Sequence, residues 1–206
     1  VNKALELNSQ SSYIYYIKAK IYYAMGKYNN AEKEIDTAVV LDMKNFDNYT
    51  MYARILSKKG DFKGAIEKIE AAEKIDSENQ ELMLMKGIVY KNIDDYTNAL
   101  KYFRKVKNRR LRKEAYLEIG ESYLNLNRPR KALSYFKKAQ RSGNALANKH
   151  LARIYYEAGN LNKAVRYYKK ALASDRTDTL ALRQLGYIYK ERKNWVKALS
   201  YFKRYL

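Results

Sequence analysis

The segment 149–175 reads KHLARIYYEAGNLNKAVRYYKKALASD, and the segment 182–206 reads LRQLGYIYKERKNWVKALSYFKRYL. In each segment, apolar residues recur every three or four positions in two blocks, and a short polar stretch separates the blocks. This spacing predicts two amphipathic α-helices joined by a turn. Related segments follow one another along the chain, so the fold is decided by a repeated helix pair.

One alanine marks the second helix of every copy, and its successive spacings are 34, 34, 33, 32 and 34 residues. A small residue stands twelve positions before each alanine, and a large apolar residue stands four positions after it. Small residues allow two helix axes to approach closely, while large ones fill the space against the next pair. The alanines are Ala31, Ala65, Ala99, Ala132, Ala164 and Ala198; the small residues are Ala19, Ala53, Gly87, Gly120, Ala152 and Gly186.

This order of small, aromatic and alanine positions resembles the tetratricopeptide repeat, a helix–turn–helix of about 34 residues. The resemblance covers nearly the whole chain and implies an all-α superhelical solenoid of stacked antiparallel helix pairs, with about thirteen helices. Residues 1–11 resemble the end of a preceding repeat. Because the chain starts at Val1, inside an expected helix and without an initiator Met, we expect a segment of a longer protein. The expected repeats are 12–45, 46–79, 80–112, 113–144, 145–178 and 179–206.

Two copies are shorter than the others, by one residue around 106–113 and by two around 140–145. We therefore expect tightened turns between repeats at these two places. Within the repeats, Gly and Asn tolerate the left-handed backbone that ends a helix. Turns inside the helix pairs are expected at Gly26, Gly60, Asp94–Asp95, Asn127 and Gly159.

The composition excludes several kinds of chemistry. The 206 residues include no Cys and one His, so disulfides, thiol nucleophiles and multi-histidine metal sites are excluded. Asp94–Asp95 fits a helix start better than a metal site, and His150 has no recognisable nucleophile partner. The carboxylates of Glu114, Glu118 and Glu121 share one helix face, but no closed pocket is implied. We predict no enzymatic activity, no cofactor and no metal.

The family resemblance implies that the first helix of each repeat lines a concave groove that binds a peptide or helix of a partner. The tyrosines could alternatively fill helix-packing positions, and we expect this for Tyr22, Tyr90, Tyr123, Tyr155 and Tyr189. For Tyr13, Tyr16 and Tyr23 both roles stay open. The residues expected to face the groove are Tyr13, Tyr16, Lys20, Tyr23, Met51, Arg54, Met85, Lys149, Arg153, Tyr156, Arg183, Tyr187 and Lys190.

The formal charge of +20 lies entirely in residues 80–206, which carry 30 basic and 10 acidic side chains. Basic doublets occupy equivalent positions in four successive second helices, where stacking would form a ladder on the convex side. Such a field attracts acidic proteins, anionic membrane surfaces or nucleic acid. A generally basic proteome would also explain the excess of positive charge. The residues of this expected basic face are Arg104, Lys105, Lys137, Lys138, Lys169, Lys170, Lys203 and Arg204.

Taken together, these patterns predict a non-enzymatic protein–protein interaction scaffold whose partner is a protein or peptide, acidic if it uses the basic half. The alternative is a nucleic-acid-binding module that uses the convex basic face of residues 80–206. No apolar run approaches the length of about 20 residues that a membrane-spanning helix needs. The sequence leaves the compartment open between cytoplasm, slightly favoured, and export. The apolar ends of the first and last repeats offer surfaces for self-association.

Overall fold

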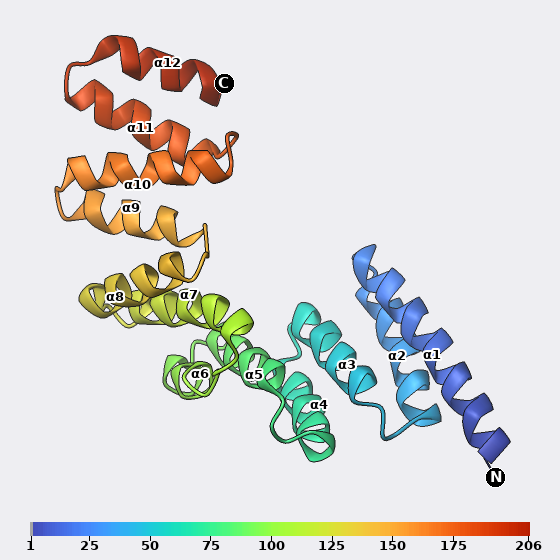
Figure 1. Ribbon diagram of the computed structural model, residues 1–206. Coiled ribbons are helices and arrows are strands. Elements are labelled where there is room, and N and C mark those ends of the chain that lie inside the picture. Colours follow the sequence, from blue (N-terminus) through green and yellow to red (C-terminus); the bar gives the residue numbers. More distant parts are fainter. Residues whose placement is uncertain (1) are drawn as a thin grey trace. The chain divides into compact units, whose positions relative to one another are not determined.

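The computed structural model describes residues 2–206, and side chains from residue 11 onward. The chain divides into two compact units, Val1–Val106 and Lys107–Leu206. Twelve helices and no strands occur in residues 2–206, so the predicted all-α class is confirmed (Figure 1). The first unit contains α1 (Asn2–Ala24), α2 (Tyr28–Leu41), α3 (Phe46–Lys59), α4 (Phe62–Ile75), α5 (Gln80–Asn92) and α6 (Tyr96–Phe103). The second contains α7 (Arg109–Asn125), α8 (Pro129–Arg141), α9 (Ala147–Glu157), α10 (Leu161–Ser174), α11 (Thr179–Glu191) and α12 (Trp195–Tyr205).

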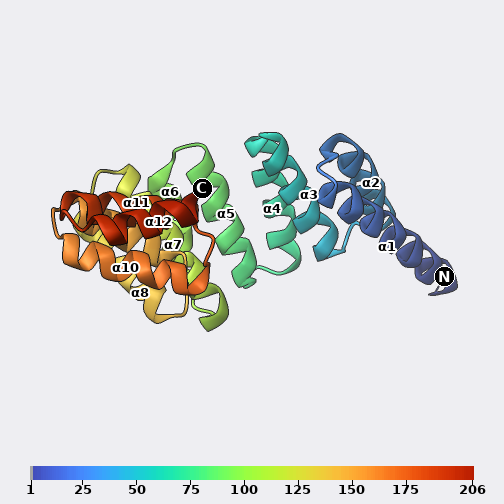
Figure 2. The ribbon, with the colours of Figure 1, turned by 90° about the horizontal axis from the view of Figure 1, so that it is seen from above.

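Within each unit, every helix packs against the one that follows it. Figure 2 shows α1 to α5 following one another along the first unit, and Figure 1 shows α9 to α12 stacked in the second. The count of twelve helices, rather than about thirteen, arises because α1 runs unbroken from Asn2 to Ala24. The side chains of residues 1–10 lie outside the described part, so their assignment to a preceding repeat stays a prediction.

The turns inside the helix pairs use left-handed backbone, as predicted. At five of these turns the residue with positive φ is one that the sequence singled out. Lys193 has a φ of 56° in the last pair and carries no turn signal in the sequence. The five expected residues, with φ between 53° and 86°, are Gly26, Gly60, Asp94, Asn127 and Gly159.

Close approach of the two helices of a pair depends on the small residue of the first helix. A Cβ atom added to Gly87, Gly120 or Gly186 would lie 2.5, 2.6 or 2.5 Å from a phenylalanine ring of the second helix. These rings belong to Phe103, Phe136 and Phe202, sixteen residues further along the chain. In the other three pairs the small residue is Ala, and the residue sixteen positions later is Ile35, Ile69 or Tyr168. Glycine is therefore found where the facing residue is phenylalanine.

One buried cation ties two helices of the first unit together. The ammonium group of Lys86, on α5, lies 2.9 Å from Glu73 and 3.4 Å from Glu70, both on α4. Burial lowers the pKa of Lys86, but the hydrogen bond and charge of Glu73 outweigh burial, so the pKa lies above its ordinary value. Lys86 is therefore charged inside the helix stack, which the sequence pattern did not reveal.

We expect Gly120→Ala to lower the free energy of unfolding by about 1–3 kcal/mol, because the added methyl group overpacks against Phe136. This loss opposes a gain of about 1 kcal/mol from the better helix propensity of alanine. In a Phe136→Ile background, which copies the natural Ala53–Ile69 pair, the same Gly120→Ala change should be neutral or stabilising. Urea unfolding of the wild type, both single variants and the double variant measures this difference. Equal effects of Gly120→Ala in the two backgrounds would contradict the proposed contact.

Candidate functional site

The candidate site residues fall at a few fixed positions relative to the small residue of each first helix. Most lie three residues before it, one after it or four after it. These three positions share one side of an α-helix, since they are separated by four and three residues. We call this side the first-helix face.

In the first unit the first-helix face of α1 is rich in tyrosine. Tyr13 is 62% exposed and stacks on Tyr16, with ring centroids 6.3 Å apart. The ammonium group of Lys20 lies 5.3 Å from the centre of the Tyr16 ring, and Tyr23 packs edge-on against Tyr28. On α3, Arg54 is exposed and lies 3.9 Å from Glu81 of α5. The face therefore presents aromatic rings and cations, although Tyr16 and Tyr23 are also partly buried against the core of the unit.

In the second unit, contacts between neighbouring first helices join α7, α9 and α11 at one surface. His150 of α9 lies 3.3 Å from Glu121 of α7. The hydroxyl of Tyr156, also on α9, donates a hydrogen bond of 3.2 Å to Glu191 of α11. Burial, followed by this bond, raises the pKa of Tyr156. The exposed residues of this face are Arg153, Arg183, Tyr187 and Lys190.

Residues two positions before the small residue have a different role. Met51 is only 6% exposed and belongs to the core of the first unit. Met85 is partly buried against the same core. At this position in the second unit, His150 stacks on Phe136 of the preceding repeat, with ring centroids 4.5 Å apart. Since this position serves packing between repeats, Met51 is not accessible on the first-helix face.

Lys149 is also less available than the sequence suggested. Its ammonium group lies 2.7 Å from a carboxylate oxygen of Asp178, whose side chain is 2% exposed. The other oxygen of Asp178 accepts a hydrogen bond of 3.1 Å from the N–H of Ala181 and so caps α11. Asp178 thus fixes the start of α11 against α9, a role that the sequence analysis missed.

Tyrosine pairs accompany the predicted basic doublets, and these pairs were not predicted. In four repeats a tyrosine of the first helix lies against one of the second, with centroids 5.4–5.6 Å apart. Three of these pairs are stacked within 10° of parallel, and the pair Tyr123–Tyr135 is tilted by 33°. The stacked pairs are Tyr90–Tyr102, Tyr155–Tyr167 and Tyr189–Tyr201.

In the second unit, each ring of these pairs also has a cation above it. The distances from the charged group to the ring centre run from 4.5 to 5.9 Å, within the range of cation–π attraction. One cation of each doublet therefore rests on a ring of its own repeat. The six cations are Lys131, Lys138, Lys163, Lys170, Lys197 and Arg204.

The first members of the doublets are less uniform. Lys169 reaches forward, 6.0 Å from the ring of Tyr189 in the next repeat. Arg104 and Lys203 are exposed, and Lys137 is partly exposed. In the first unit, Lys105 lies over the ring of Tyr102. The doublets thus combine cations that contact tyrosine rings with cations that are exposed to solvent.

Within the described residues, His, Asp and Glu side chains form no group of three that could hold a metal ion. Asp94 and Asp95 act at the start of α6, where a side-chain oxygen of Asp95 accepts a hydrogen bond from the N–H of Asn98. This bond is the main cause that lowers the pKa of Asp95.

Among the residues that the structure describes, no helix combines the length and the apolar character needed to cross a membrane.

Family models of the tetratricopeptide repeat match most of the chain, at residues 12–44 and 46–79 and, overlapping, at 84–147, 117–179 and 149–206. The chain therefore belongs to the tetratricopeptide-repeat family, whose members are typically non-enzymatic interaction scaffolds. The predicted resemblance is confirmed. A comparison with curated proteins gives no match.

Solved structures of other repeat proteins share the fold. PilF of Pseudomonas aeruginosa is 19% identical, with a TM-score of 0.80 over 94% of this chain and 90% of that one. PilW, described as a widely conserved type IV pilus biogenesis factor, is 24% identical, with a TM-score of 0.77 over 93% and 90%. YrrB, described as a TPR protein with an unusual peptide-binding site, is 26% identical, with a TM-score of 0.60 over 88% and 95%.

Two variants should distinguish the two roles of Asp178, which caps α11 and pairs with Lys149. Asp178→Ala removes both the cap and the ion pair and should cost about 1–3 kcal/mol of unfolding free energy. Asp178→Asn retains an acceptor for the N–H of Ala181 and should cost less, since Lys149 is partly solvated. Thermal and urea unfolding measure both. Asn194→Ala, which removes a cap of α12 without an ion pair, is the control, and its expected cost is about 1 kcal/mol.

Proposed function

We propose that this chain is a non-enzymatic protein–protein interaction scaffold that binds a peptide or a helix of a partner on its first-helix faces. The observation that carries the proposal is the surface shared by α7, α9 and α11. There, Arg153, Arg183, Tyr187 and Lys190 are exposed around the bridge from Tyr156 to Glu191. The peptide-binding site reported for YrrB supports a ligand of the same kind.

The residue types on this face suit a protein ligand. Tyr and Arg are enriched among the residues that dominate binding energy at protein interfaces. Tyr187 is 46% exposed and leans edge-on against Phe202, with ring centroids 5.4 Å apart, so its orientation is restrained before a ligand arrives. A pre-positioned aromatic ring loses less conformational entropy on binding than a mobile one. Arg153 pairs with Glu157 of its own helix at 3.5 Å. Arg183 and Lys190 are therefore the cations that favour a ligand carrying carboxylates.

A peptide selected from a random library for binding to this chain tests the proposal. The variant Arg183→Ala/Tyr187→Ala should weaken its binding by about tenfold or more. The matched control is Arg166→Ala/Tyr205→Ala, which removes an exposed Arg and a Tyr that is 39% exposed from the second helices of the same unit. The control should bind within about twofold of the wild type. Equal losses in both variants, with both folded by circular dichroism, would refute the site.

The second candidate function is binding of nucleic acid through the basic doublets, favoured by the concentration of positive charge in residues 80–206. Proteins that bind single strands offer aromatic rings on which bases stack. In this chain the tyrosine rings beside the doublets already lie against another tyrosine, a cation or both. This arrangement supports the protein partner over nucleic acid.

Charge reversal at Lys137 and Lys203 tests the second candidate without disturbing the ring contacts. If the scaffold proposal holds, Lys137→Glu/Lys203→Glu should leave binding of the selected peptide unchanged. Titration with a single-stranded RNA at about 150 mM salt should detect only weak binding, since phosphate contacts are screened there. Tight RNA binding that this variant abolishes would favour the nucleic-acid function instead.

A further inference from the structure

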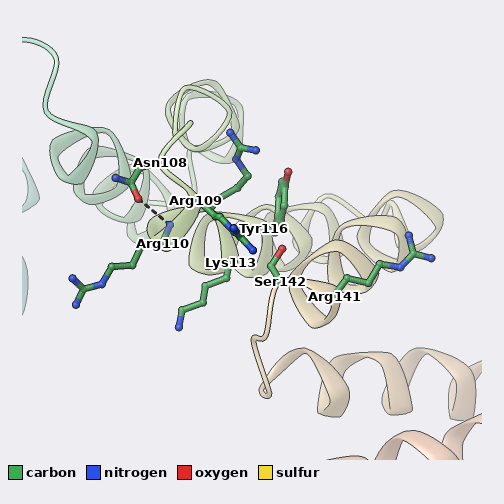
Figure 3. A pocket seen from close by; sticks show the side chains of 8 residues that line it. Asn108, Arg109, Arg110, Lys113, Tyr116, Arg141 and Ser142 are labelled. Atoms are coloured by element: carbon green, nitrogen blue, oxygen red, sulfur yellow. Dashed lines mark hydrogen bonds between the residues drawn. The ribbon is translucent and has the colours of Figure 1, made fainter.

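A hollow of about 870 Å³ lies in the second unit (Figure 3). Residues from the start of α7 and the end of α8 line it. Five of its eight lining residues are cationic, and none is a carboxylate. The lining residues are Asn108, Arg109, Arg110, Arg112, Lys113, Tyr116, Arg141 and Ser142.

The hollow is built where the repeat departs from regularity. Helix α7 begins eleven residues before its small residue, Gly120, whereas α3, α5 and α11 each begin seven residues before theirs. The additional turn at the start of α7 carries Arg109, Arg110 and Arg112. Regular stacking does not need this turn, since three other first helices lack it. Its sequence is therefore available for another purpose.

The second wall of the hollow comes from the end of α8 and the residue that follows it, near the other place where a repeat is short. Helices α7 and α8 pack against each other, so the end of α8, at Arg141, meets the start of α7. The side-chain amide of Asn144 donates a hydrogen bond of 3.2 Å to the backbone oxygen of Lys113. This bond holds the α8–α9 turn against α7. The cations are thus placed by helix packing and a specific turn contact.

Ion pairs within the described residues leave the cations of the hollow without a carboxylate partner. None of the ion pairs formed among residues 11–206 joins a carboxylate to Arg109, Arg110, Lys113 or Arg141. The guanidinium group of Arg112 donates a hydrogen bond to the backbone oxygen of Lys107. Because this acceptor is uncharged, the positive charge of Arg112 is retained. The N–H groups of Arg110 and Leu111 donate to the side-chain oxygen of Asn108, so the side-chain cations provide most of the attraction for an anion.

The shape and chemistry of the hollow select among anions. Tyr116 and Ser142 lie near one another at the centre of the view, Arg110 and Arg141 reach out to opposite sides, and Lys113 extends away from the centre (Figure 3). This spread suits an extended chain of charges better than a single ion. Four of the cations are arginines, whose planar guanidinium groups form bidentate pairs with carboxylates and phosphates alike.

Tyr116 does not provide an open ring for stacking on a base. Its ring lies 6.1 Å from that of Tyr135, and the ammonium group of Lys138 lies 5.8 Å from its centre. Base recognition on single strands relies on open aromatic faces. The hollow therefore favours carboxylates of a peptide over a nucleic acid.

We propose that this hollow binds an extended acidic segment of a partner protein, rich in Asp and Glu, as a second site whose lining residues differ from the exposed residues of the first-helix face. The guanidinium groups of Arg109, Arg110 and Arg141 pair with successive carboxylates. The Tyr116 and Ser142 hydroxyls supply hydrogen bonds at the centre. A partner that carries both a groove-binding peptide and an acidic stretch would engage the two sites together, with a gain in effective concentration.

Fluorescence anisotropy at about 150 mM salt, where exposed charges are screened beyond about 8 Å, tests this proposal. The probes are labelled octaglutamate, octaglutamine and octauridylate. Octaglutamate should bind more tightly than the other two. The variant Arg109→Gln/Arg110→Gln/Arg141→Gln should weaken octaglutamate binding by about tenfold or more, since it removes charge-assisted hydrogen bonds from exposed residues that the fold does not need.

The matched control, Arg130→Gln/Arg166→Gln/Lys203→Gln, removes the same charge from exposed positions of α8, α10 and α12. It should weaken octaglutamate binding by less than about threefold. Equal weakening in both variants would overturn the proposal, because it would show that octaglutamate is attracted by the overall positive charge of the chain and not by the hollow. Absence of octaglutamate binding, or tighter octauridylate binding that the first variant abolishes, would also overturn it. The Arg183→Ala/Tyr187→Ala variant should retain octaglutamate binding, which separates this test from that of the first-helix face.

Discussion

Close approach of two helices at a small residue is the constraint on which each repeat depends. The rings of Phe103, Phe136 and Phe202 occupy the volume that a Cβ atom would need on the facing glycine. Once the two helices are this close, the alanine of the second helix is fully or almost fully buried, as at Ala132 and Ala198. The remaining apolar side of each pair is then presented to the next pair, since a single pair cannot bury it alone.

This constraint explains how much of the fold was predictable. Spacing between small residues and alanines suffices to place helix pairs, and glycine or asparagine suffices to place most turns. The left-handed Lys193 was not predictable, because lysine has no preference for that backbone and the packing of α11 on α12 imposes it. The additional turn of α7 was hidden for a related reason. Its arginines are compatible with a helix or a loop, and only the packed structure decides between them.

The residues of the candidate sites were also predictable only where their position depends on a single helix. Helical periodicity, together with the family resemblance, selected Arg153, Arg183, Tyr187 and Lys190, and all four are exposed in the structure. It failed for Met51, because one helix in isolation does not show which of its positions faces the preceding repeat. The buried partner of Lys149 and the presence of Arg141 and Arg109 around one hollow both depend on contacts between elements far apart in the sequence. Such contacts follow from stacking geometry, and no local motif encodes them.

The division of the chain at residue 106 also separates two electrostatic regimes. The first unit carries 17 basic and 15 acidic residues, and the second carries 25 basic and 7 acidic residues. Self-repulsion therefore opposes the compact state in the second unit far more than in the first. Dissolved ions screen that repulsion, so ionic strength acts on the two halves unequally. Salt alone can therefore change the order in which the two halves unfold on heating. If the two hydrophobic cores contribute equal stability, the second half unfolds first in dilute buffer.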